Sequence, residues 1–172
     1  MTAELSHSDW LVLGALATGA THGFAVSASL AKDGDLGRIW SVRRPMVYQS
    51  VGKLVSLGLV AERASERSST GPSRTPLELT AEGRQLLERW LTTPVDHLRD
   101  MRPLLLTKLV LLDRLGLDRG SLIEAQRARF AALMDVAVPD DQDDVDRLVG
   151  QWRIEVARAA TAFLEECGRP LS

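Results

Sequence analysis

Cysteine and histidine are scarce in this sequence. Cys167 is the only cysteine among 172 residues, so no internal disulfide can form and nothing indicates an oxidising compartment. The three histidines, His7, His22 and His97, lie far apart in the sequence and show no metal-ligand spacing. We therefore expect no disulfide framework, no metal site and no cofactor.

Long apolar runs are missing as well. The most apolar segment, 104–115, is interrupted by Lys108, Asp113 and Arg114, and it falls short of the roughly 20 residues that a membrane helix needs. The first residues lack the basic segment and apolar stretch that are typical of a secretory signal. We expect no membrane helix, and the cytoplasm is the expected location.

Motifs for catalysis are also absent from the sequence. No serine or cysteine lies in a recognised nucleophile motif, and no G-x-x-x-x-G-K-[ST] phosphate loop occurs. The acidic residues at 140–146 lack the glycine and the terminal glutamate of a calcium-binding loop. We therefore expect no catalytic residues and no enzyme activity.

Aromatic residues make up only 5% of the chain, whereas hydrophobic residues reach 45% and charged residues 26%. These proportions are typical of a folded protein whose core consists mostly of Leu, Val and Ala, which favours helices. The length allows one ordinary domain or two small ones.

The charges are distributed unevenly. Residues 38–74 contain seven basic residues and only two acidic ones, whereas residues 135–166 contain nine acidic residues and three basic ones. This asymmetry suggests that the N-terminal half binds an anion while the C-terminal half has another task. Two ordinary solvated surfaces are the alternative.

Periodicity and end signals predict a mixed N-terminal half. Ser6 and Asp9 fit a capping box at the start of the first helix. Glycines, aspartates and prolines separate the elements that follow. The expected elements are helices at 7–18, 23–32, 45–57 and 81–92, a brief strand at 38–42, and two strands at 59–64 and 74–79 around a polar loop. We expect Pro76 to lie at an exposed edge of the hairpin.

The C-terminal half reads as entirely helical, with helices at 102–115 and 119–137 and a long last helix after the acidic segment 140–144. One row of apolar residues in the last helix repeats at nearly heptad spacing, which is usual in helices that pair. Its members, predicted to form a dimer seam, are Val145, Leu148, Trp152, Val156, Ala159 and Phe163. Packing of this row within the same chain is the alternative.

The order of these elements describes a winged helix-turn-helix domain at 1–93, which would bind DNA, followed by a helical dimerisation domain at 94–172. The helix at 45–57 has an apolar stripe and a small, polar outer face suited to the major groove. The predicted DNA-contacting residues are Arg43, Arg44, Tyr48, Gln49, Lys53, Arg63, Arg67 and Arg74. The alternatives are a Tyr48 ring packed against the wing, and solvated side chains at Gln49 and Lys53.

The sequence resembles the PadR-like transcriptional regulators over nearly its full length. The resemblance is carried by segments in a fixed order, namely Leu5-Ser6, Leu13-Gly14-Ala15-Leu16, His22-Gly23-Phe24, Trp40-Ser41-Val42, 47–54, Gly58-Leu59-Val60, Gly71-Pro72-Ser73-Arg74 and 79–83. The chain departs from the family pattern at Gln49, where a proline commonly follows the tyrosine. It departs again at 75–77, where tyrosines are usual.

The resemblance implies a homodimer joined by its C-terminal helices, and repression that an effector relieves. Since some members of the family stack planar drugs on interface tryptophans, Trp90 and Trp152 are candidate contacts for a planar hydrophobic effector; a place in the core is the alternative. We expect Trp10 and Trp40 to be core residues. The predicted function is a sequence-specific, effector-responsive repressor that binds promoter DNA, and the alternative is a winged-helix module that binds only proteins.

Overall fold

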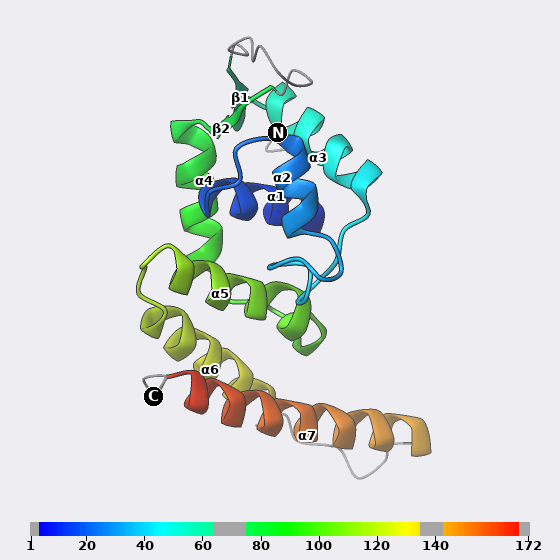
Figure 1. Cartoon of the computed structure of the whole chain (residues 1–172). Coiled ribbons are helices and arrows are strands. Elements are labelled where there is room, and N and C mark those ends of the chain that lie inside the picture. The colour runs from blue at the N-terminus through cyan, green and yellow to red at the C-terminus, as the bar shows by residue number, and fades with distance from the viewer. Residues whose placement is uncertain (1–3, 64–74, 135–142, 169–172) are drawn as a thin grey trace.

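The computed structural model describes residues 4–63, 75–134 and 143–168. A winged helix-turn-helix unit at the N-terminus sits on a layer of C-terminal helices (Figure 1). The elements are α1 (His7–Ala17), α2 (Gly23–Ser29), α3 (Arg44–Ser56), β1 (Val60–Glu62), β2 (Leu77–Leu79), α4 (Ala81–Thr92), α5 (Leu106–Arg114), α6 (Gly120–Met134) and α7 (Asp144–Cys167). The predicted fold, mainly helical with a small hairpin wing, is confirmed.

Helix α1 forms the centre of the N-terminal unit. Its residues from Leu11 to Leu16 are all buried, and α2, α3, α4 and β2 pack around them. The predicted capping box is present, because Ser6 and Asp9 exchange hydrogen bonds between side chain and backbone. Gly19 ends the helix with a positive φ of 112°, as expected of a glycine stop.

The segment after α2 differs from the prediction. Residues 38–42 form turns, not a strand, and α2 ends at Ser29. Leu36 N and Gly37 N both donate to Ser29 O, and Val42 N donates to Leu30 O. The chain therefore folds back over the end of α2. Within 38–42, the N–H groups of Arg38, Ile39 and Trp40 donate to turn carbonyls at Gly34 and Leu36 and so form no strand ladder.

The wing is a short antiparallel hairpin in which Val60 pairs with Leu79. Leu77 N donates to Thr21 O, and an isolated bridge joins His22 to Pro76. The prediction that Pro76 lies at an exposed edge is wrong, because the loop between α1 and α2 covers that side of β2.

The first turn of the predicted helix 102–115 is a π-turn, Met101–Leu105, which leads into α5. Pro103 lies within it, and a proline has no N–H for a regular helical bond. Helix α5 reaches α1 at Gly14, where an added Cβ would lie 2.6 Å from Leu111 Cδ1. The absence of a side chain at Gly14 therefore allows the two units to meet closely.

Helix α7 packs along α6 through one face, whose buried residues are Ala157, Ala160 and Leu164. Arg127 of α6 and Glu165 of α7 add an ion pair of 2.8 Å. The N-terminal half of α7 extends past α6 (Figure 1). None of the described helices, α7 included, is both long enough and apolar enough to span a bilayer.

Two buried polar side chains hold the connection between α4 and α5. Gln126 bonds the backbone of Val95 in both directions, accepting from its N at 2.7 Å and donating to its O at 2.9 Å. Lys108, which is only 3% exposed, donates to Thr93 O. The predicted division into 1–93 and 94–172 coincides with this connection and stays a prediction.

Burial of Lys108 generates a prediction about stability. The pKa of Lys108 is lowered to about 8, chiefly because burial penalises the charged ammonium group. Between this value and the usual 10.5, the unfolded chain holds a proton that the folded chain has released. The free energy of unfolding should therefore rise with pH across this window, by up to about 3 kcal/mol.

Urea unfolding of the wild type and of Lys108→Met, measured from pH 7.5 to 10, checks this expectation. Methionine retains an apolar stem of similar length and cannot titrate. The difference in unfolding free energy between the two proteins should grow in favour of the wild type as pH rises. Parallel pH profiles would show that Lys108 keeps an ordinary pKa in the folded chain.

Candidate nucleic-acid interface

Helix α3 has two different faces. Val47, Ser50, Val51 and Leu54 are buried against the unit, whereas the outer face is exposed and carries Tyr48, Gln49 and Gly52. A Cβ at Gly52 would have no neighbour within 4 Å, so packing does not require a glycine there. The missing side chain at Gly52 makes the outer face of α3 less bulky, as predicted for a helix that enters a groove.

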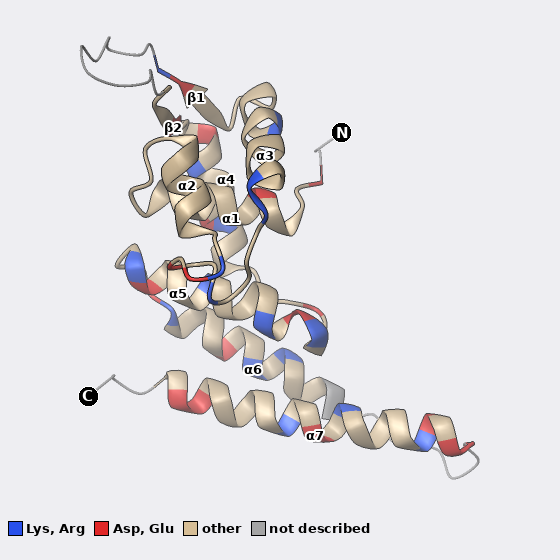
Figure 2. Ribbon diagram, turned by 45° about the vertical axis from the view of Figure 1, so that its right-hand side comes forward, with Lys and Arg blue, Asp and Glu red and all other residues tan. Residues whose placement is uncertain are grey.

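The first turn of α3 is exposed and basic. Arg43 is the N-cap residue and makes no capping bond with its side chain, and Pro45 occupies the first turn. Free amides at a helix start and the helix dipole both attract anions. Arg43 and Arg44 are both exposed beside these amides. Figure 2 shows basic residues near both ends of α3, whereas acidic residues gather at the two ends of α7.

Arg44 lies between two aromatic rings. Its guanidinium carbon is 5.7 Å from the ring centre of Phe24 and 5.7 Å from that of Tyr48. The two aromatic residues remain 55% and 45% exposed, respectively. Cation–π contacts of this kind restrict an arginine to one region of space while leaving its N–H groups available. Phe24 is not among the DNA-contacting residues predicted from the sequence, because it belongs to the apolar side of the helix predicted there.

The ring of Tyr48 packs against the start of α2 instead of the wing. A Cβ at Gly23 would lie 2.9 Å from Tyr48 Cε1, so only a glycine fits beneath the ring without a shift. The alternative in which Tyr48 packs on the wing is therefore wrong. Two residues of the His22-Gly23-Phe24 motif therefore contact the exposed side of α3. Gly23 leaves room for the Tyr48 ring, and the Phe24 ring lies beside Arg44.

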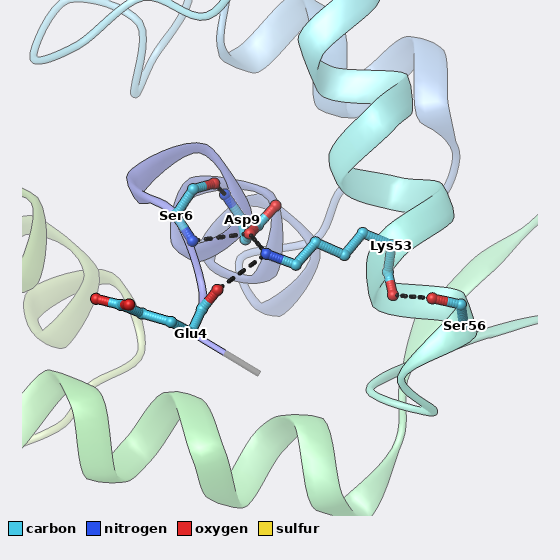
Figure 3. Close-up of polar contacts among 5 residues, drawn as sticks. All are labelled: Glu4, Ser6, Asp9, Lys53 and Ser56. Carbon is cyan, nitrogen blue, oxygen red and sulfur yellow. Dashed lines mark hydrogen bonds and ion pairs between the residues drawn. The ribbon is translucent and has the colours of Figure 1, made fainter. Parts of the chain in front are cut away.

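Lys53 is not the free cation that the sequence predicted. Its Nζ forms an ion pair with Asp9 Oδ2 at 2.7 Å and also donates to Glu4 O at 3.0 Å (Figure 3). Because this charge is already paired within the chain, Lys53 does not belong with the exposed arginines. The side chain is 39% exposed, so Lys53 is both paired and partly solvated.

The described part of the wing contributes one of the three predicted arginines. Arg63 is exposed and pairs with Glu78 across the hairpin. This contact lowers the pKa of Glu78 through its hydrogen bond and charge. Arg67 and Arg74 lie outside the described residues.

The four tryptophans occupy different environments. Trp10 stacks on Trp90, with ring centres 4.8 Å apart and planes inclined by 7°, and Lys108 Nζ lies 4.7 Å from the centre of the Trp90 ring. These contacts support the core alternative for Trp90. The prediction of a core position for Trp40 is wrong, because this residue is 46% exposed; its ring centre lies 5.4 Å from that of His7.

Trp152 belongs to an exposed apolar stripe on α7. Val145, Leu148, Trp152 and Phe163 are all exposed, and Trp152 reaches 57%. The alternative that this row packs within the same chain is therefore wrong, since α7 meets α6 through a different face. The two candidate effector residues are also separated, because α5 and α6 lie between α4 and α7 (Figure 1).

A hollow of about 460 Å³ lies where α1, α2 and α5 meet. Its lining residues are Ala15, Thr18, Ala20, Ala25, Ser29, Asp35 and Arg114. Arg114 and Asp35 form an ion pair of 3.4 Å there. Neither Trp90 nor Trp152 lines this hollow. Within the described ranges, no group of three or more His, Cys, Asp or Glu side chains could hold a metal ion.

Comparison with solved structures finds weak similarity along nearly the whole chain. One structure is Bacillus subtilis PadR in complex with operator DNA, at 20% identity and a TM-score of 0.47, covering 92% of this chain and 95% of that one. The same protein with p-coumaric acid gives 21% identity and a TM-score of 0.44, covering 94% and 96%. Smu.1604c from Streptococcus mutans is 14% identical, with a TM-score of 0.45, and the match covers 92% of this chain and 96% of that one. No family model and no curated protein matches the sequence. The assignment of a winged helix rests on the elements described above.

The paired Lys53 generates a second prediction about stability. Lys53→Met would leave the Asp9 carboxylate buried without its cationic partner. A buried polar group that loses its partner costs about 1–3 kcal/mol. We expect the unfolding free energy at pH 7 to fall by this amount. Lys32→Met, at an exposed lysine outside α3, serves as the control and should change stability by less than about 0.5 kcal/mol. Equal stability of the two variants would contradict a stabilising role for the pair.

Proposed function

We propose that this chain is a sequence-specific DNA-binding regulator of transcription that acts as a homodimer and places α3 in the major groove. The observation that carries the proposal is the exposed outer face of α3. Arg43 and Arg44, which form no ion pair within the described residues, lie at its start, and a hairpin wing lies beside it. A regulator of this kind would work in the cytoplasm and would need no catalytic residues.

The dimensions of α3 suit a DNA groove. Its 13 residues give a length of about 20 Å, and a major groove about 12 Å wide admits one α-helix. The buried stripe fixes which face points outward, and Gly52 leaves room at the middle of that face. Close approach of the helix backbone to the base edges is therefore sterically allowed.

The predicted contact residues of α3 and of the wing have different roles in the proposal. Arg43 and Arg44 neutralise phosphates at the groove edge, and the rings beside Arg44 reduce the entropy lost when its guanidinium is ordered. Gln49 reads a base, since its amide can bond adenine at two positions. Tyr48 contacts a phosphate or a base edge. The wing arginines, Arg63, Arg67 and Arg74, contact the backbone or the minor groove of the flanking DNA.

The exposed stripe of α7 supports association with a second copy. A 24-residue helix with large apolar side chains repeated at nearly heptad spacing exposes far more apolar surface than a solitary helix normally leaves in water. The seam proposed for the dimer consists of Val145, Leu148, Trp152, Val156, Ala159 and Phe163. Two copies would then present two α3 helices to successive turns of a duplex.

The names of the similar structures suggest the partners. Bacillus subtilis PadR was solved with operator DNA and with p-coumaric acid. By analogy, the partners proposed for this chain are promoter DNA and a small planar hydrophobic effector that relieves repression. Trp152 is the better placed of the two candidate effector contacts, because Trp90 is already engaged by Trp10 and Lys108.

The salt dependence of DNA binding tests the proposed interface. Each phosphate contact contributes about 0.9 to the slope of log K against log salt concentration. Arg44→Gln should therefore weaken binding to every duplex and reduce the slope by about one. Lys32→Gln removes one charge away from α3 and should leave both quantities unchanged.

Fluorescence anisotropy with labelled duplexes at several salt concentrations provides the measurement. Absence of salt-dependent binding by the wild type would contradict the proposed function and favour a module that binds only proteins. Equal effects of the two variants would show that total charge matters and that Arg44 has no special position.

Removal of the central seam residue tests the dimer. Trp152→Ala should raise the dimer dissociation constant at least about tenfold, because a tryptophan at the centre of an interface commonly contributes 2 kcal/mol or more. Arg153→Ala, at the exposed neighbouring position, is the matched control. Sedimentation velocity over a dilution series separates the outcomes. A wild type that is monomeric at all concentrations, or a variant that dimerises as tightly as the control, would contradict the proposed seam.

A further inference from the structure

Asp9 is a buried carboxylate in the first turn of α1. It is 2% exposed, and α1 continues from it into the buried run that begins at Leu11. Burial alone raises the pKa of Asp9, but hydrogen bonds from Lys53, Ser50 and Ser6 outweigh burial and hold the pKa below its usual value. The carboxylate is therefore charged at neutral pH, and a buried charge must keep its partners.

The partner with the opposite charge comes from the recognition helix. Lys53 lies in the last turn of α3, and its Nζ reaches across to the first turn of α1 (Figure 3). A second bond from the same nitrogen, to Glu4 O, holds the chain just before α1. Lys53 thus joins the C-terminal end of α3 to the first turn of α1 and to the chain just before it, although Lys53 and Asp9 are 44 positions apart in sequence.

Moving Lys53 to a DNA phosphate would break this arrangement. The ammonium group would leave Asp9 charged and buried, and removing one partner of a buried pair is strongly unfavourable. Arg43 and Arg44, at the other end of α3, can bind a phosphate without breaking an ion pair. No salt bridge joins either of them to an acidic side chain within the described residues.

We propose that Lys53 is a positioning residue, which sets the orientation of α3 on the unit through Asp9 and Glu4 while Arg43 and Arg44 supply the phosphate contacts. This inference rests on the proposed function and assigns different roles to the basic residues at the two ends of α3. Gln49 lies one helical turn before Lys53, so the tilt that Lys53 fixes decides how Gln49 approaches a base.

This division separates two quantities that a phosphate contact would change together. Non-specific affinity and its salt slope depend on the number of neutralised phosphates. Preference for one sequence depends on base contacts, which need the helix in one orientation. Loss of a positioning residue should therefore reduce preference while the salt slope stays the same.

The double variant Lys53→Met with Asp9→Asn tests the proposal. It removes both charges together, so no unpaired carboxylate is left in the core, and asparagine retains an oxygen that can accept from Ser6 N. The probes are a duplex selected from random sequences by the wild-type protein, and a scrambled duplex of the same composition. Circular dichroism and thermal unfolding verify that the variant is folded at the assay temperature.

We expect the double variant to bind the selected duplex about tenfold more weakly, the loss that accompanies one misplaced base contact. Binding to the scrambled duplex and the salt slope should equal those of the wild type. Lys53→Arg, which can still reach Asp9, should keep most of the preference. Arg44→Gln is the contrasting variant and should lower both affinities together.

Three results would overturn the inference. A slope lower by about one in the double variant, with equal loss on both duplexes, would make Lys53 a phosphate contact. Unchanged affinity for both duplexes would remove any role in DNA binding. Either result leaves the proposed function intact. If the wild type binds no duplex, the proposed function fails, and the inference fails with it.

Discussion

The burial of α1 is the constraint on which the rest of the structure depends. Its run from Leu11 to Leu16 is covered on one side by α3 and on others by α2, α4 and β2, and Gly14 admits Leu111 of α5. Helix α3 and the C-terminal helix α5 are therefore packed against the same element. A displacement of α5 would therefore be transmitted to α1 at Gly14, and α1 in turn packs against α3.

Features set by local chemistry could be predicted from the sequence. The capping box at Ser6 and Asp9, the glycine stops at Gly19 and Gly58, and the bounds of α4 depend on neighbouring residues alone, and the structure has all of them. Features set by distant contacts could not. The strand expected at 38–42 was lost because Val42 N donates to Leu30 O after α2, while the N–H groups of 38–40 donate to carbonyls of the intervening turns.

The same distinction applies to the candidate site. The exposure of Arg44, Tyr48 and Gln49 follows from helical periodicity, which also identifies the buried stripe of α3. The partner of Lys53 lies on another helix 44 residues away, and nothing near Lys53 in the sequence reveals it. Periodicity likewise identified the apolar row of α7, but it could not tell whether that row faces α6 or a second copy. In the structure, Ala157, Ala160 and Leu164 on a neighbouring face are buried, and most of the row is exposed.

Protection of guanine N7 atoms from methylation by dimethyl sulfate tests the central claim most directly, because these atoms face the major groove. The account predicts two protected clusters on a selected duplex, about 34 Å apart or a multiple of that distance, one for each α3 of a dimer. Protection at a single cluster would contradict the paired arrangement. Binding that leaves every guanine N7 reactive would contradict the placement of α3 in the major groove.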